Sequence, residues 1–373
     1  MAYHRTPGHR PDRRAFSAPV AAVAAALLIA AGCRLSHVPS GPAAPTRVVM
    51  GYYASWTRAG FDHTQVAFGN LTHIAHAFVW PDPSGNLVVP ARFVYPELNA
   101  AAHASGVKMI LSLGGSDHSA GFPGMTAASA NRARFIGQVV DFCAANDYDG
   151  IDVNWEYVSN AEERESFVLF IEALGAALKS RTPPLLLTVA APANNYWARW
   201  IDFERLLDDL DLIGLMTYDY HGAWSGHSGH NAPLYAWDGD RCGSVDGTLA
   251  YARGRRIPPG KLLVGIPFFG CSFDCGGFGE PFETSRHLSY SEIMGLPATE
   301  WALGWDANGR VPFLRRLDGT AIISFDDMRS ASLKCQYVKD HQAAGVMIWE
   351  LSQDARSGSP ELLEVIGRSF GVR

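Results

Sequence analysis

Short apolar segments alternate with amphipathic segments along most of the chain. Eight segments of six to eight residues are rich in apolar and β-branched side chains, as buried strands are. They are residues 48–53, 72–79, 108–113, 150–155, 185–191, 210–217, 262–267 and 346–351. Stretches such as 132–145, 161–180 and 330–344 lie between them and carry apolar residues three and four apart, as helices do. Eight alternations predict an α/β fold, a (β/α)8 TIM barrel, whose functional residues lie at the carboxyl ends of the strands.

The same alternation could also build a doubly wound open sheet. That fold places a glycine-rich phosphate-binding turn after its first strand, and no such turn follows Tyr53, so we favour the barrel. The connection between Phe269 and Ile322 is too long for one crossover. It contains glycine-rich turns, a short helical pattern at 289–294 and possible strands. We therefore predict a small α+β insertion at 271–322, after the seventh barrel strand.

The amino-terminal residues predict export. Four arginines precede an apolar stretch at 18–32, which is shorter than the roughly 18–20 residues of a spanning helix, so a retained membrane anchor is the weaker alternative. Arg13 and Arg14 resemble a twin-arginine motif, and residues 30–33 resemble a bacterial lipobox. We predict an export signal at 1–32, lipidation of Cys33 and a proline-rich linker at 33–46; ordinary cleavage nearby is the alternative. The protein would be an envelope or periplasmic lipoprotein, or secreted.

Charge and cysteine content exclude some partners. The whole chain has a formal net charge of -6, and the part after the basic leader is more acidic still, which argues against nucleic acid. Residues 47–373 suffice for one large domain. Cys271 and Cys275 are close enough in sequence to form a disulfide, with Cys242 as another possible partner, whereas Cys143 and Cys335 lie in helical patterns and should be buried thiols. No four ligands have the spacing of a zinc site, and we expect neither a metal nor a cofactor.

The run 149–156 carries the clearest candidate chemistry. Successive side chains of a strand alternate between its faces, so Asp152, Asn154 and Glu156 should point the same way, with Glu156 at the strand's carboxyl end. Burying polar groups costs several kcal/mol each unless they are paired. Such a cluster on a buried strand therefore predicts an active site.

This run resembles the D-x-x-D-x-D-x-E signature of family 18 glycoside hydrolases, the chitinase family, with Asn154 in the third acidic position. The resemblance extends over nearly the whole domain, and each matching segment falls at the end of a predicted strand. These segments are Gly51-Tyr52-Tyr53 with Trp56, Ser112-Leu113-Gly114-Gly115, Met216-Thr217-Tyr218-Asp219 with Trp224, and Gly345 to Glu350, which includes Trp349.

The resemblance implies substrate-assisted catalysis, in which the sugar supplies the nucleophile. Glu156 would act as acid and base, with Asp152 and Asn154 in the same catalytic motif. Asn154 would accept a hydrogen bond from the acetamido N–H. Tyr218 would donate to the acetamido oxygen, and Asp219 would contact both the sugar and the acid. The alternative role for Glu156 is that of a partner in a structural ion pair. The alternative role for Tyr218 and Asp219 is hydrogen bonding within the core.

The resemblance also implies substrate-binding residues. Trp349 would form the apolar floor under the reacting sugar, with core packing as its alternative, and Trp56 and Trp224 would face neighbouring sugars. The remaining predicted contacts are Tyr52, Ser112 and Met216.

Two departures from the family pattern concern activity. Asn154 is neutral and cannot offset the positive charge of the intermediate, which predicts slow turnover. Glu156 also has no like charge beside it, so its pKa should be lower and the enzyme's activity shifted to more acidic pH. Ser116 stands where many chitinases place a tryptophan, and Phe268 to Cys271 replace a P-x-Y-G-R-like run. The grip on the leaving-side sugar is therefore weak or built differently, which puts specificity for chitin in doubt.

The sequence thus predicts a monomeric retaining hydrolase of β-1,4-linked N-acetylglucosamine, acting on chitin or its oligosaccharides. Its only membrane contact would be the lipid at Cys33. Cleavage of peptidoglycan or an N-glycan is one alternative. A chitinase-like lectin that binds sugar with little or no turnover is another, and Asn154 favours it mildly.

Overall fold

The structure, a computed structural model, describes residues 47–237, 240–356 and 359–372. The predicted export signal, the linker and Cys33 lie outside these residues. Within the described ranges, none of the helices combines the length and the apolar character needed to cross a membrane.

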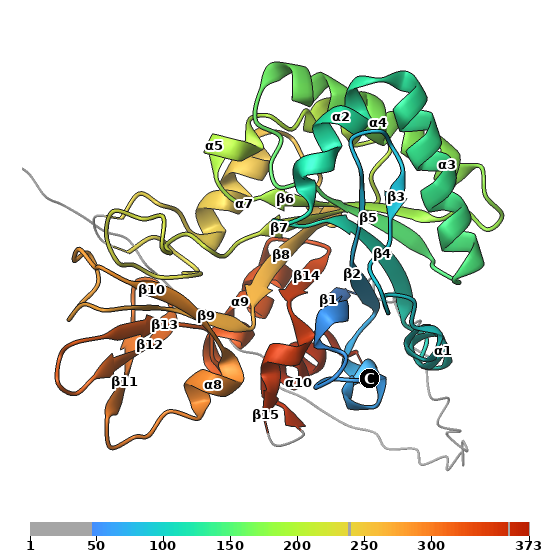
Figure 1. Ribbon diagram of the computed structural model, residues 1–373. Helices are drawn as coiled ribbons and strands as arrows, with labels where there is room; N and C mark the ends of the chain where they lie inside the picture. Colours follow the sequence, from blue (N-terminus) through green and yellow to red (C-terminus); the bar gives the residue numbers. More distant parts are fainter. Residues whose placement is uncertain (1–46, 238–239, 357–358, 373) are drawn as a thin grey trace, which may run out of the picture. The chain divides into compact units, whose positions relative to one another are not determined.

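Eight parallel strands close into a barrel, as predicted (Figure 1). The strands follow one another around the barrel in chain order, and β1 closes it by pairing with both β2 and β14. A short strand, β3 (Leu87–Val88), adds to β2 in the antiparallel sense. The barrel strands are β1 (Val48–Ala54), β2 (His73–Pro81), β4 (Lys108–Gly114), β5 (Gly150–Asn154), β6 (Leu186–Pro192), β7 (Leu212–Met216), β8 (Leu262–Pro267) and β14 (Gly345–Trp349).

Helices pack around the outside of the barrel, and α2, α3 and α4 lie together on one side of it (Figure 1). Helix α4 shows why these segments are helical: the Asn160 side chain caps its first turn by accepting from the N–H of Glu163, and Lys179 complements its last turn. The helices are α1 (Pro96–Ala104), α2 (Phe122–Ala127), α3 (Ser129–Ala145), α4 (Ala161–Lys179), α5 (Asn195–Ala198), α6 (Phe203–Leu206), α7 (Val245–Gly254), α9 (Met328–Asp340) and α10 (Glu361–Phe370).

Apolar side chains fill two separate spaces. The larger core lies between the strands and the surrounding helices. The smaller one fills the barrel interior with residues such as Met50, Ile110, Leu263 and Met347. Gly214 leaves room there, because a Cβ on it would lie 2.7 Å from the sulfur of Met347. The barrel is thus a packed core rather than a pore, and polar chemistry is left to its carboxyl end.

A five-stranded antiparallel sheet follows β8 and forms the predicted insertion. Its strand order is β10-β9-β13-β12-β11, and it spans 269–324, slightly more than the predicted 271–322. None of the five described cysteines is in a disulfide, so the bridge considered between Cys271 and Cys275 is not formed. The lobe's elements are β9 (Phe269–Phe273), β10 (Ser285–Ser289), α8 (Tyr290–Met294), β11 (Trp301–Asp306), β12 (Val311–Arg316) and β13 (Ile322–Ser324).

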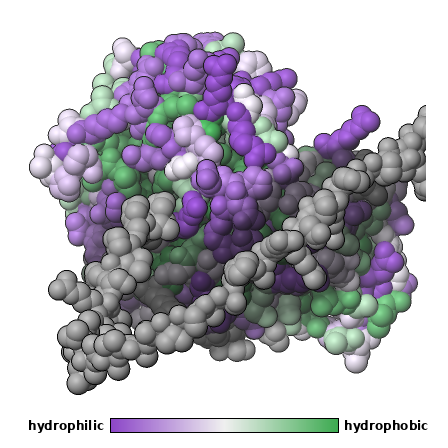
Figure 2. Space-filling model, turned by 180° about the vertical axis from the view of Figure 1, so that it is seen from behind, coloured by the Kyte–Doolittle hydropathy of each residue, from purple (hydrophilic) through white to green (hydrophobic). Residues whose placement is uncertain are grey.

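Seen from behind, the molecule has a surface on which hydrophilic residues spread widely, with smaller hydrophobic areas between them (Figure 2). Exposed apolar side chains in the lobe include Leu303 and Leu317. Single exposed apolar residues of this kind are normal on soluble domains.

Candidate active site

A cavity of about 1060 Å³ lies at the carboxyl ends of the barrel strands. This is where barrel enzymes place their active sites. Nine of the eleven predicted site residues in the described chain line it: Tyr52, Trp56, Asn154, Glu156, Met216, Tyr218, Asp219, Trp224 and Trp349. The other two, Asp152 and Ser112, are buried and do not line the cavity.

Asp152 is bound by three hydroxyl groups inside the barrel. Its carboxylate accepts hydrogen bonds from Tyr52 Oη at 2.8 Å, Ser112 Oγ at 2.7 Å and Thr188 Oγ1 at 2.7 Å. Ser112 and Thr188 reach it because they occupy the same register on the two strands that flank β5. Burial raises the pKa of Asp152, while the three hydroxyl donors oppose that rise.

Ser112 was wrongly predicted to contact the substrate. Its side chain is fully buried, and its hydroxyl already donates to Asp152. Tyr52 does line the cavity, but its hydroxyl is likewise engaged by Asp152. Both residues therefore hold the carboxylate in place from neighbouring parts of the barrel wall.

Asn154 has an acceptor that the described residues leave unused. The side chain is buried, its amide forms a hydrogen bond with Glu156, and its Oδ1 has no hydrogen-bond partner within the described ranges. Most buried polar atoms are hydrogen-bonded, so an orphaned acceptor that lines a cavity is a candidate for a ligand's donor.

Two glycines allow the strand ends to approach one another here. Gly114 and Gly115 both have positive φ angles, and the N–H of Gly115 donates to the Asn154 carbonyl at 2.8 Å. A Cβ on Gly114 would lie 2.4 Å from that carbonyl oxygen, and one on Gly115 would lie 2.5 Å from the Phe78 ring. Larger side chains would push β4 away from Asn154.

Glu156 is half-buried just beyond the end of β5, and its backbone N–H donates to Ser119 Oγ at 2.9 Å. Burial raises the pKa of Glu156 to about 7, hydrogen bonds from Tyr157 and Asn154 work against this rise, and the charge of Asp219 adds to it. The carboxyl group therefore keeps its proton up to about neutral pH, as a general acid requires. The hydrogen bond from Asn154 lowers the pKa of Glu156, but burial outweighs it. The predicted acid shift relative to an aspartate at this position stays a prediction.

Tyr218 and Asp219 follow the end of β7. Burial is the main cause that raises the pKa of Tyr218 well above its ordinary value, and the charge of Glu156 adds to it. The Tyr218 hydroxyl therefore remains a donor. The N–H of Asp219 donates to Asn231 Oδ1, and its carboxylate lies 3.3 Å from Nε2 of His287 in the inserted lobe. Hydrogen bonding to Asp219 raises the pKa of His287 to about 10, which makes this histidine a cation beside the site.

Aromatic rings form one wall of the cavity. The Trp349 ring stacks on Phe78 with centroids 5.7 Å apart, and Tyr52 and Trp56 lie against it at 5.4 and 6.3 Å. Trp56 is 59% exposed and Trp224 is 62% exposed. Rings that are held from one side and open on the other suit stacking against the apolar faces of sugars.

Sequence reasoning missed a second group of aromatic residues. Tyr157 stacks on Trp197 at 5.0 Å, the Tyr196 ring meets Trp197 edge-on at 4.8 Å, and all three line the cavity together with Ser116. The sequence did indicate two of these residues, since Tyr196 and Trp197 follow a predicted strand at its carboxyl end. His287 gave no such signal, because only the folded lobe brings it to Asp219.

The fold and the cavity define a (β/α)8 barrel with an acidic group and aromatic walls at its carboxyl end, an arrangement that suits carbohydrates. The chain belongs to glycosyl hydrolases family 18, because the family model matches residues 48–354.

Relatives and solved structures agree with this assignment. A probable endochitinase from Caenorhabditis elegans is 30% identical over 347 residues, which cover 81% of this chain and 55% of the relative. The crystal structure of Ostrinia furnacalis Group IV chitinase in complex with allosamidin superimposes with a TM-score of 0.81, at 25% identity, over 87% of this chain and 99% of that one. The chain spans little more than half the length of the worm relative.

Not every protein with this fold is described as an active chitinase. Human YKL-39, solved in the presence of chitooligosaccharides, superimposes with a TM-score of 0.81 at 25% identity, over 87% of this chain and 99% of that chain. YKL-39 is described as a pseudo-chitinase with retained chitooligosaccharide binding. Family membership therefore leaves activity to be argued from the residues of the site.

Proposed function

We propose that this protein is a retaining hydrolase of β-1,4-linked N-acetylglucosamine, acting on chitin or its oligosaccharides. The observation that carries the proposal is the pair formed by Asn154 and Glu156. Glu156 is a carboxyl group with a pKa of about 7, and Asn154 beside it presents an unpartnered buried acceptor. A sugar with an acetamido N–H would satisfy that acceptor while it lies next to the acid. The chitinases among the relatives support the same substrate class.

In the proposed mechanism Glu156 donates its proton to the glycosidic oxygen. The carbonyl oxygen of the substrate's own acetamido group attacks the anomeric carbon, and the bond to the leaving sugar breaks. Water then opens the resulting oxazolinium ion from the other side, and the Glu156 carboxylate takes up the water's proton. The two displacements give net retention at the anomeric carbon.

Two further residues orient the acetamido group. Asn154 Oδ1 accepts its N–H, and the Tyr218 hydroxyl, which stays protonated, donates to its carbonyl oxygen. Asn154 contributes no negative charge to the positively charged intermediate, which predicts slow turnover. Electrostatic stabilisers of this kind contribute roughly 10²-fold to 10³-fold in rate.

The test is product analysis with purified protein. Wild type and Glu156→Gln are incubated with chitin oligosaccharides, and products are measured by mass spectrometry while the anomeric form is followed by NMR. We expect β-anomeric products from the wild type and a rate lower by roughly 10²-fold to 10⁴-fold in the variant. Asp117→Asn, which removes another carboxyl group from the same cavity, is the control and should retain most activity.

The same assay separates the alternatives. Peptidoglycan and an N-glycan are included as substrates, and cleavage of one of them without cleavage of chitin oligosaccharides would replace the substrate class. The lectin alternative is favoured by Asn154 and by the likeness to YKL-39. Sugar binding without product from any of the three glycans would leave the lectin as the function.

We also propose that the protein is exported and lipidated at Cys33, a residue outside the described part of the chain. The proposal rests on the basic and apolar leader and on the lipobox-like residues 30–33. Metabolic labelling with a fatty acid should mark the wild type and not Cys33→Ser. Equal labelling of both proteins would rule lipidation at Cys33 out.

A further inference from the structure

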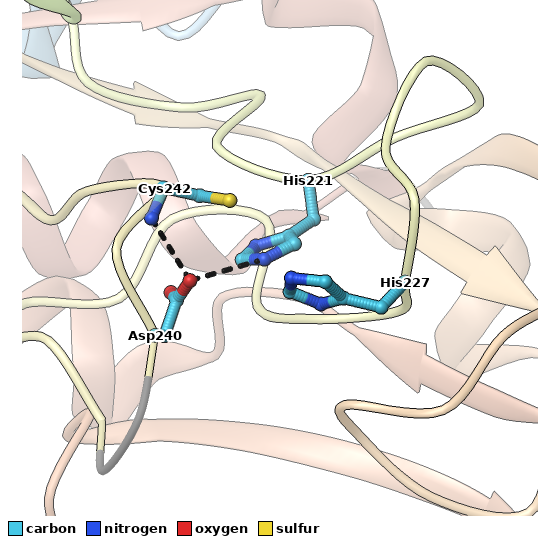
Figure 3. A group of neighbouring side chains, drawn as sticks. All are labelled: His221, His227, Asp240 and Cys242. Carbon is cyan, nitrogen blue, oxygen red and sulfur yellow. Dashed lines mark hydrogen bonds and ion pairs between the residues drawn. The ribbon is translucent and has the colours of Figure 1, made fainter.

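Four side chains with metal-binding atoms meet in the loop between β7 and α7. They are His221, His227, Asp240 and Cys242, and one ligand atom from each lies within 4.8 Å of the others (Figure 3). The group is distinct from the acid Glu156. Its residues have irregular spacing in the sequence, which is why no zinc pattern was evident there.

Backbone carbonyls hold a proton on Nδ1 of both histidine rings. Nδ1 of His221 lies 3.0 Å from the carbonyl oxygen of His230, and Nδ1 of His227 lies 3.1 Å from that of Ser228. A carbonyl oxygen only accepts, so Nδ1 carries the proton in each ring. When the ring is neutral, its lone pair is then on Nε2, as in histidines that ligate metals. Without a metal, His221 instead carries both protons and pairs with Asp240.

The buried centre of the group lacks hydrogen-bond partners. His221 is fully buried, and neither its Nε2 nor Oδ2 of Asp240 has a hydrogen-bond partner within the described part of the chain. The ring lies directly against Gly229, where a Cβ would be 2.4 Å from His221 Nε2. Unsatisfied buried atoms of this kind are costly unless something lies between them.

The distance between His221 and Asp240 suits a metal ion better than a direct hydrogen bond. His221 Nε2 and Asp240 Oδ1 are 3.4 Å apart. A charge-assisted hydrogen bond between them would be about 2.7–2.9 Å long. A tetrahedral ion with bonds of about 2.1 Å separates its ligands by about 3.4 Å. The pair therefore already has the separation of two ligands on one ion.

We propose that His221, His227, Asp240 and Cys242 bind one divalent transition-metal ion, for which zinc is the best match. Two imidazoles, a carboxylate and a thiolate are ligands that zinc accepts, whereas calcium and magnesium prefer oxygen alone. Four protein ligands fill a tetrahedral shell, so the ion is structural rather than catalytic.

The ion would join the two ends of the β7–α7 loop. His221 and His227 lie shortly after β7, and Asp240 and Cys242 shortly precede Ser244, which caps α7. Between them the loop carries Trp224 at the cavity and Asn231, whose side chain accepts the Asp219 N–H. Metal binding would thus stabilise one wall of the cavity, whether the protein cleaves sugar or only binds it.

The test is metal content of the full-length protein. Wild type is loaded with zinc, dialysed and analysed for bound metal, and Cys242→Ser and His227→Gln are treated alike. Both replaced side chains lie outside the fully buried core, so the variants should fold. We expect one zinc ion per wild-type chain and at least tenfold weaker binding in both variants. Cys275→Ser, a cysteine outside the group, is the control and should bind like the wild type.

Two further measurements decide how the metal is held. Cobalt in place of zinc should give a thiolate-to-metal charge-transfer band in the wild type and none in Cys242→Ser. A chelator should lower the melting temperature of the wild type and leave that of Cys242→Ser unchanged. A wild type that retains no zinc, or variants that retain as much as it does, would show the proposal to be wrong and leave His221 and Asp240 as a plain ion pair.

Discussion

Asp152 within β5 and Glu156 just beyond its carboxyl end have contrasting surroundings. Asp152, in the barrel interior, accepts hydrogen bonds from three hydroxyl groups. Glu156, beyond the carboxyl end of the strand, borders an open cavity, and the Asn154 beside it has an acceptor without a partner within the described ranges. Burial raises the pKa of both carboxyl groups, so burial alone does not distinguish them.

The difference lies in what completes each group's hydrogen bonds. The protein completes those of Asp152, which makes it a structural centre between neighbouring strands. Beside Glu156, Asn154 Oδ1 has no partner within the described residues, which leaves this acceptor available to a ligand. Buried polar groups that are fully satisfied rigidify a fold, and incompletely satisfied ones at a cavity are available for chemistry.

The largest expected effect concerns Asp152. Asp152→Ala removes the acceptor of three buried donors, and we expect the free energy of unfolding to fall by about 3 kcal/mol. Urea denaturation followed by fluorescence measures this. Asp117→Ala, at an exposed carboxylate of the cavity, should change stability by no more than about 0.5 kcal/mol. Equal losses in the two variants would mean that Asp152 has no special structural role.

The next effect concerns Asn154. Asn154→Asp restores a negative charge beside the intermediate, and we expect hydrolysis of a chitooligosaccharide to accelerate by roughly 10²-fold. The new charge should also raise the pKa of Glu156 further, so that activity extends to higher pH by roughly one unit. Initial rates measured across a pH series report both effects.

Asn194→Asp is the matched control for this change. Asn194 lines the same cavity and caps α5, a position that aspartate fills equally well. Asn194→Asp adds the same charge to the cavity, at the start of α5 rather than on β5. If both variants accelerate the reaction equally, or if Asn154→Asp does nothing, then Asn154 is not what limits turnover.

The barrel could be predicted because its strands are largely apolar runs, and the alternation along β5 predicted a polar face that leads to Asn154 and Glu156, both of which line the cavity. What could not be predicted depends on neighbours across strands. The register that brings Ser112 to Asp152 is a property of paired strands, so Ser112 was misassigned to the substrate. His287 reaches Asp219 only through the folded lobe, which local sequence does not reveal.

The smallest expected effect is on stability and follows from the raised pKa of Glu156. Because this pKa is about 7 rather than its ordinary 4.5, the folded chain holds a proton that the unfolded chain has already released between these values. As the pH rises through this window, Glu156 therefore increasingly disfavours the folded state. Glu156→Gln cannot lose a proton, so its melting temperature should rise relative to that of the wild type.

We expect that advantage to be near zero at pH 4 and about 1–3 °C at pH 8, measured by thermal denaturation of both proteins. Burial also raises the pKa of Asp354 to about 7, but Asp354 is present in both proteins, so its titration cancels in the difference. A difference that does not grow with pH would mean that the cavity leaves Glu156 hydrated, and the contrast between Asp152 and Glu156 would then rest on hydrogen bonding alone.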